Sequence, residues 1–201
     1  MTKRAKTLTN SQLQTVLVHV DVNSSNPIRD YVILLLSFKA GLRSAEISGL
    51  QWTDVTDGFN NIGQSADGER FFSIPANIAK KGHGRVVPMH PAIYAALTAL
   101  RATLPAHLTR GRQHIIRGAH SPRMTPGALQ KYIERLYSGL GLRGCSSHSG
   151  RRSFITAMAR TASSHDCSLH DVQKIAGHRH LSSTEAYIDL SSSAARMVAA
   201  L

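Results

Sequence analysis

The sequence has few of the features that mark a secreted, disulfide-bonded or membrane protein. Its two cysteines, Cys145 and Cys167, form no C-x-x-C pair, which excludes a disulfide framework and a zinc ribbon and fits a reducing cytoplasm. The most apolar run, residues 31–40, is too short to span a bilayer, and the N-terminal MTKRAKTLTN lacks the apolar core of a signal peptide. We therefore expect no membrane association and no secretion.

Motifs for metal and nucleotide chemistry are also missing. No G-x-x-x-x-G-K-[ST] loop is present, so nucleotide hydrolysis is not expected. His178-x-His180, and Cys145 with His148, match no recurrent zinc spacing, and no paired carboxylates are placed for magnesium. The sequence predicts no metal site and no cofactor.

Acidic residues are scarce. Twelve Asp and Glu face 24 Lys and Arg, which gives a formal net charge of +12. Residues 101–152 hold ten basic residues and one acid, Glu134. An excess of this size points to a polyanionic partner, with nucleic acid as the leading candidate, whereas a solvated basic surface that aids solubility is the alternative.

The hydrophobic pattern predicts a mainly α fold with one small antiparallel β-sheet, in a single domain of residues 7–201 behind a basic tail of residues 1–6. FFSIPANIAKKGHGRVVPM, residues 71–89, predicts two strands around a glycine-bearing turn, and it follows an irregular stretch, residues 52–68. Capping and proline signals place helix starts at Thr9, Pro27, Ser44, Pro91, Thr125, Ser168 and Ser182, with another helix over residues 151–160.

Four blocks of the sequence, in order, resemble the signature blocks of the catalytic domain of tyrosine recombinases, the phage integrase family. The blocks are GLRSAEISGLQW (41–52), KKGHGRVVP (80–88), HSGRRSF (148–154) and AGHRHLSSTEAYIDL (176–190). A single block occurs by chance in many proteins, but four in the family's order do not. The resemblance implies a short, single-domain member without the separate N-terminal core-binding domain that most members carry.

The resemblance assigns Arg43 and Arg151 to a clamp on the scissile phosphate. Attack on a phosphodiester builds negative charge on the phosphate oxygens, and the planar, permanently charged guanidinium can hold two of them. Glu46 is implied as a supporting hydrogen-bond partner, which is compatible with the simpler view of Arg43 as a helix-end arginine paired with Glu46. The family usually has a large apolar residue at the position of Gly150, and a glycine inside a helix costs about 1 kcal/mol.

Tyr187 is implied as the nucleophile. With an ordinary pKa of about 10, only about one tyrosine in a thousand is ionised at pH 7, so it needs a base or a cationic pocket. The resemblance gives His148 a role in proton transfer and His178 a hydrogen bond to the phosphate. His148 and Arg151, at i and i+3, share a face if their segment is helical. The alternative for Tyr187 is an aromatic anchor of a C-terminal helix.

A lysine near the hairpin turn is implied as the proton donor to the departing 5′ oxygen. Counting back from Arg85 favours Lys80 over the adjacent Lys81, although the sequence leaves both open. Lys81, Arg85 and Arg152 are expected to contact the DNA, and a plain surface position is the alternative for Arg152.

The implied activity is site-specific DNA recombination of the integrase or invertase type, through a covalent 3′-phosphotyrosyl intermediate and without metal or ATP. The implied partners are double-stranded DNA, a homotetrameric synapse and an accessory DNA-bending protein. Residues 191–201 are a candidate for docking onto a neighbouring protomer, and packing on their own domain is the alternative. The implied setting is the nucleoid in the cytoplasm of a bacterium, and the protein is expected to be encoded by the bacterium or by a phage. The alternatives are type IB topoisomerase-like relaxation and a non-catalytic DNA-binding accessory protein with the same fold. The sequence does not reveal the DNA site or the outcome of recombination.

Overall fold

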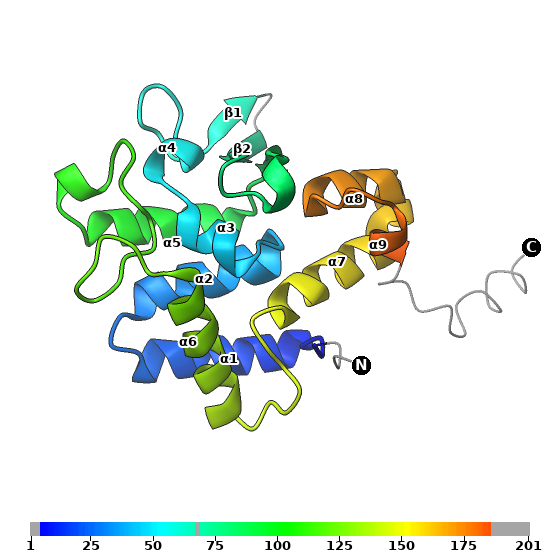
Figure 1. Ribbon diagram of the computed structural model, residues 1–201, viewed down its shortest axis with the longest axis horizontal. Helices are drawn as coiled ribbons and strands as arrows, with labels where there is room; N and C mark the ends of the chain where they lie inside the picture. The colour runs from blue at the N-terminus through cyan, green and yellow to red at the C-terminus, as the bar shows by residue number, and fades with distance from the viewer. Residues whose placement is uncertain (1–4, 67–68, 186–201) are drawn as a thin grey trace, which may run out of the picture. The chain divides into compact units, whose positions relative to one another are not determined.

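The computed structural model describes residues 5–66 and 69–185 of the chain (Figure 1). The chain divides into two compact units, Met1–Phe154 and Ile155–Leu201. Helix α7 (Ser149–Thr161) begins in the first unit and ends in the second.

The core of the first unit is built around α2 (Pro27–Lys39), which packs against α1 (Asn10–Asn23) and α5 (Pro91–Ala102). The predicted capping box opens α1, because the Gln12 N–H donates to Thr9 Oγ1 and the Thr9 N–H donates to Gln12 Oε1. The apolar residues of α2 are buried on nearly every face, as its sequence predicts.

Two short helices follow α2, namely α3 (Ser44–Gly49) and α4 (Trp52–Val55). The prediction that Ser44 caps α3 is wrong, because Arg43 holds the N-cap position and Ser44 is the first helical residue. The Glu46 carboxylate accepts the Arg43 N–H at 2.9 Å, so a side chain in the first turn of α3 satisfies this backbone donor at the start of the helix. The start of α3 is therefore fixed by an acid in its own first turn.

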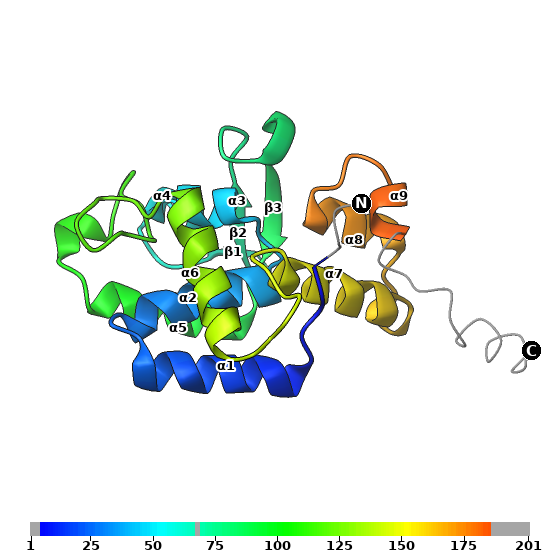
Figure 2. The ribbon, with the colours of Figure 1, turned by 60° about the horizontal axis from the view of Figure 1, so that its bottom comes forward.

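The sheet has three antiparallel strands in the order β1-β2-β3, with bounds Gln64–Ala66, Glu69–Ile74 and Arg85–Pro88. The register pairs Phe72 with Val87 and Ile74 with Arg85. Strands β2 and β3 are the predicted pair, whereas β1 lies in the stretch expected to be irregular. Figure 2 shows the β2–β3 connection extending away from the helices. It contains the 3-10 turn Lys80–Gly82.

The first unit is completed by the 3-10 turn η2 (Ala106–Leu108) and by α6 (Pro126–Gly139), which packs against α3. Thr125 caps α6 through its hydroxyl, which accepts the Ala128 N–H at 3.2 Å, as predicted. The inner face of α6 buries Leu129, Ile133 and Leu136.

The second unit contains the end of α7, the 3-10 turn η3 (Ala162–His165), α8 (Leu169–Ala176) and α9 (Ser182–Glu185). Ser168 and Asp171 form the predicted capping box of α8, and Gly177 ends this helix in the left-handed conformation with φ 62°. Over the described residues, the chain is mainly helical with one small antiparallel sheet, which confirms the predicted fold class. No helix in this part of the chain is long and apolar enough to cross a membrane.

Candidate active site

All of the HSGRRSF block except His148 forms the start of α7, which confirms the predicted helix. His148 directly precedes α7, and its carbonyl oxygen accepts the Arg152 N–H at 2.9 Å. Gly150 lies where α7 meets α2: a Cβ there would stand 2.3 Å from Ser37 Oγ and 3.0 Å from Phe38 Cδ2. The departure from the family pattern at Gly150 therefore has a physical reason, since only glycine allows this close approach of the two helices.

Arg151 is buried, with 4% of its surface exposed, and its guanidinium donates to the Gly41 carbonyl oxygen. Gly41 has φ +64°, and a Cβ at this position would lie 2.4 Å from Phe154 Cδ1. The first turns of α7 thus fix the backbone two residues before Arg43. The two arginines of the predicted clamp are joined through this short loop.

A buried carboxylate, that of Glu46, forms an ion pair with Arg43. Glu46 has no exposed surface, and its Oε1 accepts Arg43 Nη1 at 2.9 Å. Arg85 donates Nη1 to Glu46 Oε1 at 2.9 Å and Nη2 to Oε2 at 3.0 Å. Burial alone would raise the pKa of Glu46, but hydrogen bonds and charge from Arg85, and then from Arg43, outweigh it and lower that pKa. Glu46 is therefore an ionised anchor between two guanidinium groups.

Arg85 and Arg152, two of the predicted DNA contacts, make intramolecular bonds. Arg85 pairs with Glu46, and 7% of its side chain is exposed. Arg152 Nη1 donates to the Ala5 carbonyl oxygen at 3.0 Å, so it holds the described end of the predicted N-terminal tail. DNA contacts by these two residues and by Lys81 stay predictions, and the structure gives Arg85 a supporting position that the sequence reasoning missed.

His148 lies among three positive charges. Partial burial of the ring, and then the charges of Arg151, Arg43 and Lys80, lower the pKa of His148 below its ordinary value of 6.5. The structure thus brings together four predicted catalytic residues from three separate blocks. At neutral pH the imidazole is uncharged and can accept a proton. Lys80, the favoured hairpin lysine, is close enough for its charge to act on this ring.

The remaining predicted residues belong to the second unit. His178 follows the end of α8, and its Nδ1 lies 2.9 Å from Thr184 Oγ1. The side chain of Gln173 donates to the His178 carbonyl oxygen at 3.1 Å. These contacts hold the histidine and its backbone within this unit. Tyr187 and residues 191–201 lie outside the described residues.

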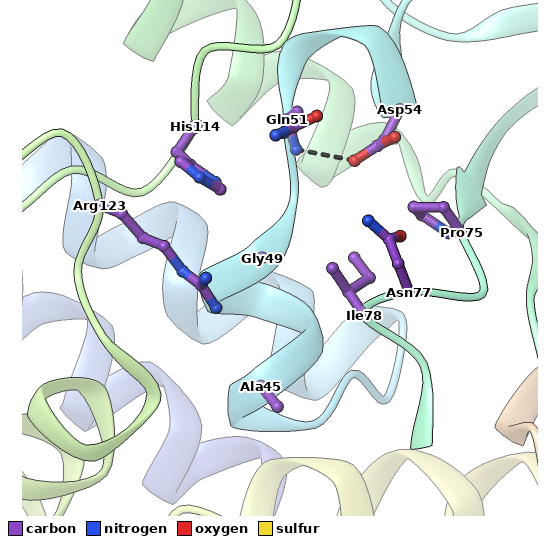
Figure 3. A pocket seen from close by; sticks show the side chains of 9 residues that line it. All are labelled: Ala45, Gly49, Gln51, Asp54, Pro75, Asn77, Ile78, His114 and Arg123. Atoms are coloured by element: carbon purple, nitrogen blue, oxygen red, sulfur yellow. Dashed lines mark hydrogen bonds between the residues drawn. The ribbon is translucent and has the colours of Figure 1, made fainter. Parts of the chain in front are cut away.

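A polar pocket of about 370 Å³ lies beside α3 (Figure 3). Figure 3 shows His114 and Arg123 on one side of it and Asp54 and Asn77 on the other, with the Gln51 N–H donating to Asp54. Burial, and then the charge of Arg123, lower the pKa of His114, whereas burial raises that of Asp54. None of the predicted catalytic residues lines this pocket. Over residues 5–66 and 69–185, no group of three or more His, Cys, Asp or Glu could hold a metal ion.

Fold and site together define a mainly helical domain that gathers arginine, lysine and neutral histidine at one place, a combination suited to a phosphate group. The sequence pattern of the phage integrase family matches residues 6–193, and the chain belongs to this family.

Curated relatives carry the name tyrosine recombinase XerC. The protein of Brucella suis biovar 1 is 29% identical over 160 residues, which cover 79% of this chain and 45% of the relative. That of Xylella fastidiosa is 24% identical over 176 residues, covering 86% and 52%. The chain thus spans about half the length of the curated relatives it matches.

Solved structures share the fold. The Tn1549 transposon integrase in complex with a circular intermediate DNA matches with a TM-score of 0.74 and 19% identity, over 100% of this chain and 67% of the other. XerH bound to its difH substrate matches with a TM-score of 0.71 and 20% identity, over 98% of this chain and 54% of XerH. The catalytic domain of bacteriophage HP1 integrase matches with a TM-score of 0.64 and 16% identity, over 98% of this chain and 95% of the other.

Proposed function

We propose that this chain carries out the strand cleavage and rejoining of a site-specific DNA recombinase, through a covalent 3′-phosphotyrosyl link to Tyr187. The observation that carries the proposal is the gathering of Arg43, Lys80, His148 and Arg151 in the first unit. Membership of the phage integrase family supports it. Complexes of the Tn1549 integrase and XerH with DNA support double-stranded DNA as the partner.

In the proposed reaction, Arg43 and Arg151 hold the two non-bridging oxygens of the scissile phosphate. Both guanidinium groups are fixed before DNA arrives, Arg43 by Glu46 and Arg151 by the Gly41 carbonyl. Fixed donors stabilise the growing charge without reorganisation, and each such donor typically contributes about 100- to 1000-fold in rate.

Two proton transfers complete the cleavage step. His148, neutral because its pKa is lowered, accepts the proton of the Tyr187 phenol as its oxygen attacks phosphorus. Lys80 donates a proton to the 5′ oxygen as its bond to phosphorus breaks, and His178 donates a hydrogen bond to the phosphate. The phosphotyrosyl ester replaces the phosphodiester one for one, so a 5′ hydroxyl can reverse the step with neither metal nor ATP.

The further parts of the proposal concern assembly and setting. Exchange of strands between two duplexes requires four active sites, and hence four protomers, with an accessory DNA-bending protein as a further partner. The proposed place of action is the bacterial nucleoid in the cytoplasm. The whole recombinase is proposed to resemble the relatives named XerC in activity.

The test is capture of the covalent adduct. A pool of nicked duplexes with randomised sequence around the nick traps the adduct, because the short cleaved strand diffuses away, and a denaturing gel separates it. We expect an adduct from the wild type and none from Tyr187→Phe. Binding without any adduct would overturn the proposal in favour of an accessory DNA-binding protein. Relaxation of supercoiled DNA of any sequence, without recombinants, would instead indicate a topoisomerase.

A further inference from the structure

The side chain of Arg85 points into the protein, although it belongs to the hairpin that carries Lys80. Exposure alternates along strand β3, where Val86 is 56% exposed and Val87 is 1% exposed. Alternate residues of a strand share a face, and Arg85 therefore lies on the side of Val87. Only 7% of its side chain is exposed. A buried arginine at this position needs a partner, and the partner is Glu46.

The Glu46 carboxylate receives four donors. Oε1 accepts Nη1 of Arg43 and Nη1 of Arg85, and Oε2 accepts the Arg43 backbone N–H and Nη2 of Arg85. A carboxylate held on both oxygens by a bidentate guanidinium has a fixed plane. The direction in which Glu46 holds Arg43 is therefore set by Arg85.

We infer that Arg85 is a positioning residue, which acts through Glu46 to orient Arg43 toward the scissile phosphate and couples the Lys80 hairpin to the start of α3. This inference rests on the proposed function. Arg85 begins β3, five residues after Lys80, and Arg43 is the N-cap of α3. The bidentate pair thus joins two segments that each carry one proposed catalytic residue.

The pair also accounts for arginine rather than lysine at residue 85. A lysine ammonium is a point charge and cannot hold both carboxylate oxygens in one plane. A methionine fills a similar volume but leaves Glu46 with half of its donors. Arg85→Lys therefore keeps the positive charge but loses the fixed plane, whereas Arg85→Met loses both.

The first test compares Arg85→Lys and Arg85→Met with wild type in single-turnover cleavage of trapping duplexes and in equilibrium DNA binding. Misplacing one positioned group typically costs about 10- to 100-fold in rate. We expect a loss of about 10-fold for Arg85→Lys and about 100-fold for Arg85→Met, with the dissociation constant for DNA changed less than about twofold. A larger effect on binding than on cleavage would overturn the inference and favour a DNA contact.

The second test asks whether Arg85 acts through Arg43. In an Arg43→Ala background, Arg85→Met should lower the cleavage rate less than about threefold, because the group being oriented is gone. If Arg85→Met lowers the cleavage rate by the same factor with and without Arg43→Ala, the inference is overturned. Arg29→Met is the matched control, since Arg29 pairs with the buried Asp30 at 2.7 Å near the start of α2. It should lower stability but leave cleavage unchanged.

A readout without DNA keeps this inference separate from the proposed function. Hindered guanidinium groups give resolved ¹⁵N–¹H signals, so the Arg43 Nη signals can be followed by NMR in the free protein. In Arg85→Met they should broaden and shift, whereas in Arg29→Met they should not. Unchanged Arg43 signals in Arg85→Met would overturn the inference even if cleavage were lost. If wild type forms no adduct but these signals respond, the proposed function fails and the network stands.

Discussion

Gly150→Ala adds one methyl group at the contact between α7 and α2. The new Cβ would stand 2.3 Å from Ser37 Oγ, 2.9 Å from Ser37 Cβ and 3.0 Å from Phe38 Cδ2. Ser37 is 2% exposed and Phe38 is 6% exposed, so neither can move into solvent. Rotation of the Ser37 hydroxyl relieves the first contact but not the second, and the start of α7 must therefore shift.

The expected cost follows from two opposing effects. Alanine is favoured over glycine inside a helix by about 1 kcal/mol, and by less at Gly150, which is the second residue of α7. Overpacking of a core contact costs about 1 to 3 kcal/mol. We expect a net loss of about 1 to 2 kcal/mol in the free energy of unfolding. The shifted turn follows His148 directly and contains Arg151, so cleavage should fall by about 10-fold or more.

Urea unfolding with a matched glycine provides the assay. Gly127 is also the second residue of its helix, α6, and a Cβ there would meet nothing within 4 Å. Gly127→Ala should be neutral or slightly stabilising. In a Ser37→Gly background, Gly150→Ala should cost less than it does alone. Equal effects of Gly127→Ala and Gly150→Ala on stability would refute the packing argument.

Four further predictions concern the charges of the site. Lys80→Met should raise the pKa of His148, followed by NMR, whereas Lys81→Met should leave it unchanged, and equal shifts would contradict the preference for Lys80. Because neutral His148 is the proposed base, cleavage should decline only as the pH falls below about 6.5, through its lowered pKa, and a decline that begins at higher pH would argue against this role. Glu46→Gln should cost about 3 kcal/mol in unfolding free energy at pH 7. Because the pKa of Glu46 is lowered from 4.5, this difference from wild type should shrink as the pH falls through the lowered pKa. A difference that does not change with pH would count against an ionised Glu46. Arg43→Ala should slow cleavage by about 100- to 1000-fold with little loss of DNA binding, measured on the same duplex.

Local signals predicted the helices well. The capping boxes at Thr9 and Ser168 depend on residues three positions apart, and proline at a first helical position acts through its own φ, so both can be read from a few neighbouring residues. The four residues of the first unit that are predicted to be catalytic could be proposed from the sequence because each stands in a motif with its own order and spacing.

Features that depend on contacts between distant segments could not be predicted in this way. Glu46 and Arg85 are 39 positions apart, and the sequence places Arg85 in a basic hairpin, where a DNA contact is the simpler expectation. The sequence does not show which face of β3 is buried, because residues 86 and 87 are both valine; only the structure puts Arg85 on the buried face, with Val87. Strand β1 has three residues and no apolar alternation, so only its pairing with β2 defines it. The fit of Gly150 against Ser37 is likewise a property of two packed helices.

The central claim is that the phenol of Tyr187 attacks a phosphate held by Arg43 and Arg151. Its most direct measurement is tandem mass spectrometry of the trapped adduct after protease and nuclease digestion. We predict a nucleotide joined through its 3′ phosphate to Tyr187 in the wild type, with the adduct strongly reduced in Arg43→Ala and absent from Tyr187→Phe. A nucleotide on another residue, or an adduct that persists in Tyr187→Phe, would contradict the account.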